Sequence, residues 1–242
     1  MVGQYSISEL IPFISWEHLY FTWNVSHSKE ASEHLKSDAL QLLESLENDF
    51  KVNYLLQRFD VDVDNENLLF CKADGSLLIP FLRQQIPNER DFCMCLTDYI
   101  CRDKSYVYCF ATSVDKRMEH SFEDDLYKNM LAKTAADRLA EACADLLQKD
   151  NGLEGIRPAV GYPSIPDMSI NFLLDELCGF RQIGIELTDN GMMMPHASVS
   201  GFIFDNPKAE YFRIGQISEE QMTDYARRRG FDIDKMKRFI YA

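Results

Sequence analysis

The segment Arg157-Pro158-Ala159-Val160-Gly161-Tyr162-Pro163 combines residue types that could bind a small ligand. Each proline holds φ near about −65°, and the glycine between them permits a positive φ, so the backbone has few accessible conformations. A guanidinium can bind a carboxylate through charge-assisted hydrogen bonds. The segment therefore suits a ligand that carries a carboxylate, a flat ring and a cationic centre. A proline-rich turn between two halves of a domain is the alternative interpretation.

Two carboxylates precede this segment, on a helix that we predict over residues 121–148. Glu141 follows Asp137 by one helical turn, so both side chains can share a face. A carboxylate stabilises a nearby sulfonium or ammonium group. A solvated polar stripe beside Arg138 is the alternative, and the sequence leaves both interpretations open.

The cysteines and histidines give less evidence for a reactive or metal-binding site than residues 157–163 give for a ligand site. The chain has seven cysteines, an odd number without a secretory leader, which favours reduced thiols. They occupy positions 71, 93, 95, 101, 109, 143 and 178. Cys93 and Cys95 alternate with apolar residues in a predicted strand, so their thiols should share one face. The histidines are scattered, and no zinc spacing is present; we expect no metal site.

Blocks of helix and blocks of strand must position these residues. Ser6 and Glu9 form a capping-box pattern, and Ser15 can cap a second helix in which Leu19, Phe21 and Trp23 should be buried. Helices are predicted over residues 16–24, 28–50, 121–148 and 169–177 and after Ser218 and Asp232. Strands are predicted over residues 52–63, 68–71, 77–79, 91–100, 105–112, 183–187, 192–204 and 209–217, with a hairpin turn at 73–76. This order predicts an α+β fold, a twisted and mainly antiparallel sheet surrounded by helices.

Composition limits the classes of function. The 242 residues are 46% hydrophobic and 26% charged, which is typical of a soluble globule with a substantial core. The net charge of −14 disfavours binding to nucleic acid or to an anionic membrane. No apolar run approaches the roughly eighteen residues of a membrane span. We expect a cytoplasmic protein.

Residues 157–163 resemble the R-P-A-x-G-Y-P segment of the activation (reactivation) domain of cobalamin-dependent methionine synthase, which binds S-adenosylmethionine. Further blocks follow in the same order as in that family: Trp16, Phe21-Thr22-Trp23, Leu82-Arg83-Gln84-Gln85, residues 136–142, Pro195, residues 197–201 and residues 224–228. The resemblance thus covers nearly the whole chain. It implies that residues 1–242 form a single activation-like domain, in which the helical N-terminal region, residues 1–50, packs on the same core.

The resemblance also implies a site for S-adenosylmethionine. Arg157 would bind the methionyl carboxylate, the backbone from Pro158 to Ser164 would contact both ends of the ligand, and Glu141 would favour its cationic centre. The family has an aspartate before Trp16 that approaches the ligand's ammonium group; here Ser15 stands there, and its hydroxyl or Glu17 would take over. The implied site comprises Ser15, Glu141, Arg157, Pro158, Ala159, Val160, Gly161, Tyr162, Ser164 and Tyr211.

The implied function is accessory. In the family, methyl transfer from S-adenosylmethionine traps the cobalt after one-electron reduction of inactive cob(II)alamin. The chain would need no catalytic residue of its own, and cobalamin would belong to the partner. We expect a stand-alone protein that acts on a separately encoded methionine synthase lacking its own activation domain. A binding-only sensor of S-adenosylmethionine or of a corrinoid is the alternative.

A cluster of basic residues near the C-terminus has two interpretations. Arg227, Arg228, Arg229, Lys235, Lys237 and Arg238 concentrate positive charge in an acidic protein. Cations at a helix C-terminus stabilise the helix macrodipole. The same charges could also dock an acidic electron donor such as flavodoxin.

Overall fold

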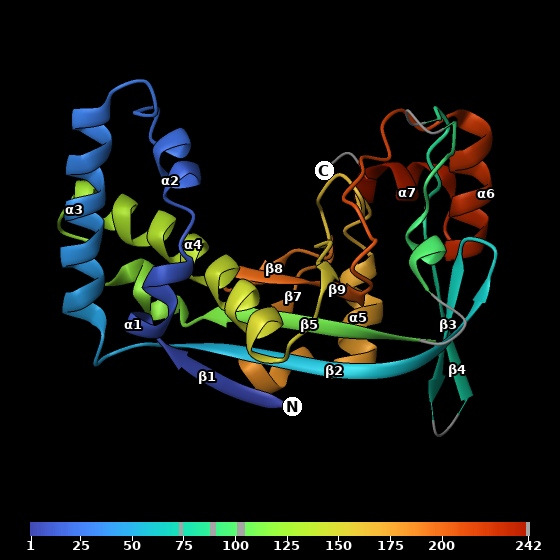
Figure 1. The fold of residues 1–242 in the computed structure, drawn as a ribbon, viewed down its shortest axis with the longest axis horizontal. Helices are drawn as coiled ribbons and strands as arrows, with labels where there is room; N and C mark the ends of the chain where they lie inside the picture. The colour runs from blue at the N-terminus through green and yellow to red at the C-terminus, as the bar shows by residue number, and fades with distance from the viewer. Residues whose placement is uncertain (73–74, 88–90, 101–104, 241–242) are drawn as a thin grey trace.

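The computed structural model describes residues 1–72, 75–87, 91–100 and 105–240 (Figure 1). Cys101 and two residues of the predicted hairpin turn, Ala73 and Asp74, lie outside these ranges. The elements in chain order, with η marking a short 3₁₀ helix, are β1 (Val2–Ser6), α1 (Ile7–Leu10), η1 (Ile11–Phe13), α2 (Trp16–Thr22), α3 (Lys29–Leu46), β2 (Lys51–Asp64), β3 (Asn67–Lys72), β4 (Gly75–Pro80), η2 (Leu96–Tyr99), β5 (Tyr106–Val114), η3 (Lys116–His120), α4 (Leu126–Asp150), β6 (Gly155–Ile156), α5 (Ile170–Cys178), η4 (Phe180–Ile183), β7 (Glu186–Leu187), β8 (Met193–Met194), β9 (Ser198–Asp205), α6 (Glu219–Arg229) and α7 (Ile233–Ile240).

The main sheet has the strand order β4-β3-β2-β5-β9-β6, and β1 pairs with the start of β2. Each of these pairs is antiparallel. In Figure 1 the long strand β2 runs from the helices α1 to α4 at one side to the β3–β4 hairpin at the other. The predicted α+β fold with a mainly antiparallel sheet is confirmed, whereas the organisation of residues 1–242 as one domain stays a prediction.

Alternation along the central strands divides the core between the two faces of the sheet. Successive side chains of a strand point to opposite faces. On β5, Phe110 and Val114 join the core beneath α3 and α4, while Val107, Cys109 and Ala111 join the core beneath α5. The buried alanines of α4 let this helix lie close to the sheet, where Thr112 donates a buried hydrogen bond to the Ala140 carbonyl (2.8 Å).

Local capping signals placed several helices correctly. The Ser6–Glu9 capping box is present at α1, and Ser28 and Ser218 accept backbone N–H groups at the starts of α3 and α6. Ser15 stands at the N-cap of α2 but makes no side-chain cap bond. The strand β1 was missing from the predicted helical N-terminal region, and it forms because the edge of β2 is available to it.

Two predictions for the helices are wrong. The helix predicted over residues 121–148 begins at Leu126 instead, because Asp125 caps it by accepting Lys128 N–H (3.1 Å), whereas Ser121 donates to the Arg117 carbonyl. Phe21 is 77% exposed, although Leu19 of the same helix is buried. Residues two positions apart in a helix are separated by about 200° around its axis, so only one of the pair can face the core.

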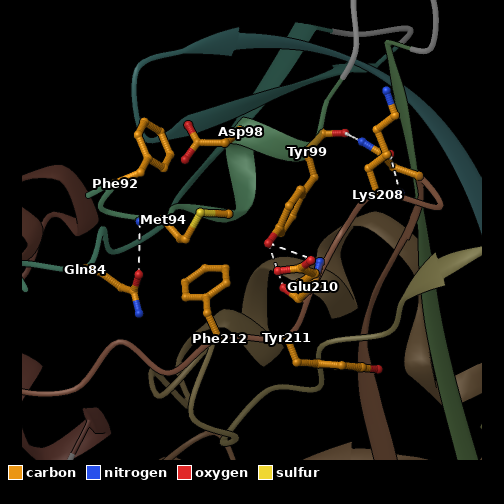
Figure 2. A pocket seen from close by; sticks show the side chains of 10 residues that line it. Gln84, Phe92, Met94, Asp98, Tyr99, Lys208, Glu210, Tyr211 and Phe212 are labelled. Atoms are coloured by element: carbon orange, nitrogen blue, oxygen red, sulfur yellow. Dashed lines mark hydrogen bonds between the residues drawn. The ribbon is translucent and has the colours of Figure 1, made fainter. Parts of the chain in front are cut away.

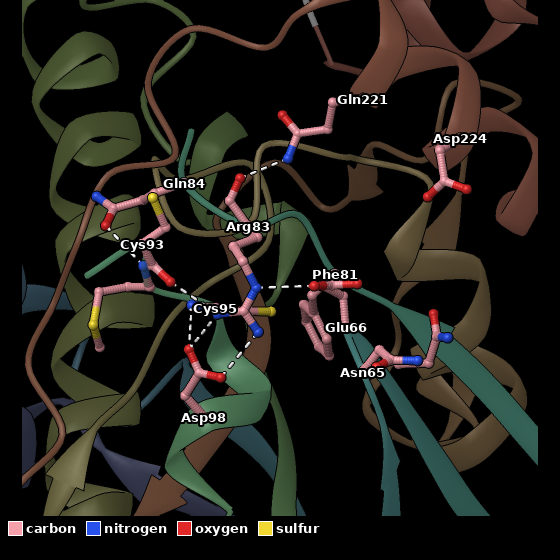
Figure 3. A network of polar contacts seen from close by, with 12 residues as sticks. Asn65, Glu66, Phe81, Arg83, Gln84, Cys93, Cys95, Asp98, Gln221 and Asp224 are labelled. Atoms are coloured by element: carbon pink, nitrogen blue, oxygen red, sulfur yellow. Dashed lines mark hydrogen bonds and ion pairs between the residues drawn. The ribbon is translucent and has the colours of Figure 1, made fainter. Parts of the chain in front are cut away.

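The predicted strand over residues 91–100 is also wrong. In Figure 3, Arg83 donates to the Cys93 carbonyl (2.8 Å) and pairs with Asp98, whose carboxylate accepts Cys95 N–H (2.8 Å). These side chains satisfy backbone groups that would otherwise need a neighbouring strand. Cys95 is buried and Cys93 half-buried, and neither belongs to a strand.

The polar cluster at Leu82–Gln85 therefore has a structural role. The Arg83 guanidinium also pairs with Glu66 (2.9 Å), and the Arg83 carbonyl accepts a bond from Gln221 (2.6 Å). Gln84 Oε1 accepts Met94 N–H (3.1 Å), and Gln85 accepts Ser218 N–H (3.0 Å). These bonds connect the hairpin to η2 and α6.

The predicted strand over residues 209–217 is irregular backbone instead. Its polar groups bond to loops and side chains: Ile214 N–H donates to the Pro163 carbonyl (2.9 Å), and Ser164 Oγ donates to the Phe212 carbonyl (2.5 Å). The segment therefore lies along residues 163–164 rather than in a sheet.

A buried ion pair anchors the chain after residue 163 to the C-terminal helices. Asp167 and Arg229 are 1% and 6% exposed, and their closest atoms lie 3.1 Å apart. Tyr225 donates to the same carboxylate (2.9 Å), and burial with the nearby Asp167 charge raises the pKa of Tyr225 well above its ordinary value. Arg228 also turns inward and donates to Asn67 (2.9 Å). Fewer basic side chains are therefore exposed near the C-terminus than the six that the sequence places there.

Among the described residues, no helix is long and apolar enough to cross a membrane. Within the same ranges, no three His, Cys, Asp or Glu side chains lie together in a way that could hold a metal ion. The six cysteines of the described chain are free.

Removing one partner of the buried ion pair should destabilise the fold. We expect Arg229→Met to lower the free energy of unfolding by about 3 kcal/mol, because it leaves the Asp167 carboxylate buried without its counter-charge. Urea denaturation measures this value. The matched control is Arg227→Met, since Arg227 is 75% exposed and should change stability by less than about 0.5 kcal/mol. Equal effects of the two substitutions would contradict the assignment.

Candidate functional site

Residues 157–160 continue from β6 along the edge of β9. Val160 N–H donates to the Ser200 carbonyl (2.9 Å), and Phe202 N–H donates to the Pro158 carbonyl (3.1 Å). The close approach depends on Gly201, because a Cβ at that position would lie 2.2 Å from the Pro158 oxygen. Glycine in β9 thus lets the segment pack directly on the sheet backbone.

The segment then turns sharply at Gly161. Gly161 has φ +85°, its N–H donates to the Ile165 carbonyl, and Ile165 N–H returns a bond to the Tyr162 carbonyl (2.8 Å each). A positive φ suits glycine. The turn presents Tyr162 at its tip with half of its surface exposed.

The Arg157 guanidinium is the centre of the polar contacts. Its side chain is 9% exposed, and Nη2 lies 2.6 Å from Asp145 Oδ1 and 3.3 Å from Glu141 Oε2. Tyr162 donates from its hydroxyl to the other oxygen of Glu141 (2.5 Å). The backbone N–H of Arg157 donates to the Tyr211 hydroxyl (2.8 Å). These contacts join α4, the 157–163 segment and the irregular 209–217 segment.

The charges determine the protonation of this group. Burial opposes the charged form of Arg157, but the Asp145 and Glu141 carboxylates outweigh burial and raise the pKa of the guanidinium. Burial and the Glu141 charge raise the pKa of Tyr162 above its ordinary value. Arg157 is therefore cationic and Tyr162 neutral at pH 7. Arg157 Nε is buried, and no described residue accepts its hydrogen.

Two adjoining pockets meet at Arg157, Glu141 and Tyr162. We call the first, of 440 Å³, the segment pocket; its other lining residues are Pro158, Ala159, Pro163, Ser164, Tyr211, Phe212 and Arg213. We call the second, of 400 Å³, the helix pocket; its other lining residues are Phe13, Ser15, His18, Phe21, Thr22, Arg138 and Asp145. Because three residues line both, the pockets form one groove, and the helix pocket has the larger number of charged lining residues.

A third pocket, of 620 Å³, lies beyond Tyr211 and Phe212, which line it together with the segment pocket. Figure 2 shows the rings of Phe92, Tyr99 and Phe212 around Met94 in this pocket. Its wall is held by Tyr99, which donates from its hydroxyl to the Glu210 carbonyl (2.6 Å).

Most of the predicted site residues come together in the groove. Those that line it are Ser15, Glu141, Arg157, Pro158, Ala159, Tyr162, Ser164 and Tyr211. Val160 and Gly161 do not line it, since Val160 is buried in the core and Gly161 forms the turn. The Ser164 hydroxyl is used to hold the Phe212 carbonyl. Glu17 lines neither pocket.

Sequence reasoning missed several lining residues, of which Asp145 makes the shortest ion pair to Arg157. Asp145 lies one helical turn after Glu141, so its place on the same face of α4 was open to inference. Arg213 and Phe212 could not be found in this way, because their segment was predicted as a strand.

A side chain at position 201 should push the segment off the sheet. We expect Gly201→Ala to lower the free energy of unfolding by about 1–3 kcal/mol, since the new Cβ meets fixed backbone. Gly3→Ala is the comparison: its Cβ would lie 2.4 Å from the Tyr54 hydroxyl and 2.5 Å from Tyr54 Cζ, so a side-chain ring rather than fixed backbone must shift, and the loss should be smaller than for Gly201→Ala. Thermal or urea denaturation of both variants measures the loss of stability. An unchanged free energy of unfolding in Gly201→Ala would show that the contact between β9 and the segment is not tight.

Comparisons with known proteins identify the family to which this fold belongs. The family model described as vitamin B12 dependent methionine synthase, activation domain, matches residues 6–152 and 149–230. A crystal structure of the MetH reactivation domain bound to AdoHcy is similar in fold, with a TM-score of 0.87 and 25% sequence identity, over 100% of this chain and 89% of that chain. The chain belongs to the family of vitamin B12-dependent methionine synthase activation domains.

Proposed function

We propose that this chain binds S-adenosylmethionine in the groove at Arg157 and thereby supports reductive reactivation of a cobalamin-dependent methionine synthase. The observation that carries the proposal is the Arg157 guanidinium, which is buried and charged at the junction of the two pockets. Its Nε–H group has no hydrogen-bond acceptor among the described residues. A ligand carboxylate is the natural partner of such a group. The structural relative bound to AdoHcy supports a ligand of this class.

The two regions of the groove suit the two ends of this ligand. Pro158, Ala159 and Phe212 give the segment pocket an apolar surface, and the exposed Tyr211 ring adds a flat face for adenosine. With adenosine in the segment pocket, the methionyl carboxylate would reach Arg157 at the junction of the two pockets. The helix pocket, lined by Arg138, Glu141 and Asp145, takes the rest of the amino-acid end.

The role of the chain in the proposed reaction is to hold and orient the methyl donor. S-adenosylmethionine would supply the methyl group to the partner's reduced cobalamin, and S-adenosylhomocysteine would be the product released from the groove. The exposed rings of Tyr162 and Tyr211 flank an open groove, so a bound ligand stays within reach of a partner. No nucleophile of this chain is required.

We further propose that the partner is a separately encoded methionine synthase that lacks an activation domain of its own. An acidic electron donor such as flavodoxin would dock on Arg227, Lys235, Lys237 and Arg238, since Arg228 and Arg229 are turned inward. The helices that carry these residues, α6 and α7, lie at the opposite side of Figure 1 from α2 and α3.

Ligand binding should depend on the geometry of the Arg157 guanidinium. Calorimetric titration with S-adenosylmethionine should give saturable binding to the intact chain, about tenfold or more weaker binding to Arg157→Lys, and none to Arg157→Ala. A lysine keeps the charge but loses the planar fork.

The control for these variants is Arg117→Ala, an exposed arginine that lines neither pocket. Its affinity should equal that of the intact chain. Thermal melts must first show that both Arg157 variants are folded. Unchanged affinity in folded Arg157→Ala would refute the assigned site.

Reactivation in trans should also be measurable. We expect the chain, with S-adenosylmethionine and a chemical reductant, to restore turnover to a cob(II)alamin-inactivated methionine synthase without an activation domain, and Arg157→Ala to fail. Methionine formation is the readout. Binding of S-adenosylmethionine without any recovery of turnover would favour the sensor over the accessory protein.

A further inference from the structure

The Arg157–Asp145 ion pair presents a cation and an anion side by side to the helix pocket. Asp145 Oδ1 lies 2.6 Å from Arg157 Nη2, and the Asp145 side chain is half exposed. Both residues line the helix pocket. No residue that the structure describes bonds to Asp145 Oδ2. An ionised carboxylate can accept up to about four hydrogen bonds, so most of this acceptor capacity remains.

An α-amino acid carries its ammonium and carboxylate groups on one carbon atom, so the groups that bind them must also be neighbours. We infer that Asp145 binds the α-ammonium group of the ligand while Arg157 binds its α-carboxylate. This inference rests on the proposed function, and it assigns the amino-acid end of the ligand to the helix pocket.

Glu141 is the other carboxylate at this point, and each of its oxygens already accepts one bond, whereas Asp145 Oδ2 accepts none from the described residues. Oε2 pairs with Arg157 (3.3 Å), and Oε1 accepts the Tyr162 hydroxyl (2.5 Å). Its side chain is also less exposed than that of Asp145. Glu141 therefore positions Arg157 and Tyr162, and Asp145 is left to contact the ligand.

The remaining polar groups of the helix pocket agree with a zwitterion. Arg138 and Arg157 supply two cations, and Glu141 and Asp145 supply two anions. Ser15 adds a hydroxyl that makes no cap bond in α2. A hydroxyl can accept from an ammonium group, but it carries no charge, so the formal counter-charge must come from a carboxylate.

The test compares S-adenosylhomocysteine with an analogue in which hydrogen replaces the α-amino group. We expect Asp145→Asn to weaken S-adenosylhomocysteine binding about tenfold, the scale of a charge-assisted hydrogen bond at a half-exposed site. The affinity for the desamino analogue should change much less, because that ligand responds only to the altered ion pair between residue 145 and Arg157. Calorimetry with the folded variants measures both constants.

Asp137→Asn is the matched control. It removes the same charge from the same helix, but Asp137 faces His196 (3.4 Å) and lines neither pocket. Both affinities should equal those of the intact chain. A rescue variant, Ser15→Asp combined with Asp145→Asn, returns one carboxylate to the pocket and should recover most of the lost affinity for S-adenosylhomocysteine.

Three results would overturn the inference. An unchanged or tighter S-adenosylhomocysteine affinity in Asp145→Asn would mean that Asp145 is idle or competes with the ligand carboxylate. An equal loss for both ligands would mean that Asp145 only positions Arg157. If the intact chain bound neither ligand, the proposed function itself would fail, and the inference with it. This outcome differs from failure of the inference alone, because it is seen with the intact chain before any variant is measured.

Discussion

The structure of the groove depends on a buried positive charge that must be neutralised. The Arg157 guanidinium lies against the ring of Phe110, 5.3 Å from its centroid, with little access to water. A buried cation without partners would be strongly unfavourable. Glu141 and Asp145 supply the counter-charge from α4, so this helix and the 157–163 segment are held in one arrangement. Tyr162 and Tyr211 are in turn placed by their bonds to Glu141 and to the Arg157 backbone.

That arrangement requires two close approaches of backbone. α4 lies near the sheet because its buried face carries alanines, and Thr112 bonds directly to the Ala140 carbonyl. The segment lies on β9 because Gly201 has no side chain. Small residues at both contacts set the distance between Arg157 and its carboxylates. These residues therefore shape the groove without lining it.

Local signals in the sequence predicted much of the fold but only some of the site. The helices predicted over 28–50 and after Ser218 correspond to α3 and α6, which Ser28 and Ser218 cap, and the β3–β4 hairpin corresponds to the strands predicted over 68–71 and 77–79. The strands predicted over 91–100 and 209–217 failed because distant side chains, those of Arg83 and Ser164, satisfy their backbone groups. Such partners lie too far along the chain to be found by periodicity. For the same reason, the pairing of Arg157 with Asp145 needed the packing of α4 against the segment.

The openness of the groove bears on the kind of chemistry it can serve. Sites in which a protein performs the reaction itself commonly exclude water around the reacting atoms. Here Tyr162 is 50% and Tyr211 62% exposed at the groove, and Phe21 is exposed beside it. The parts of these rings that a ligand leaves uncovered would lose water only against another surface. The proposed function requires a site that holds a ligand and presents one of its groups to a second molecule. A groove with a buried Arg157 to bind the ligand and exposed aromatic rings at its rim suits this requirement.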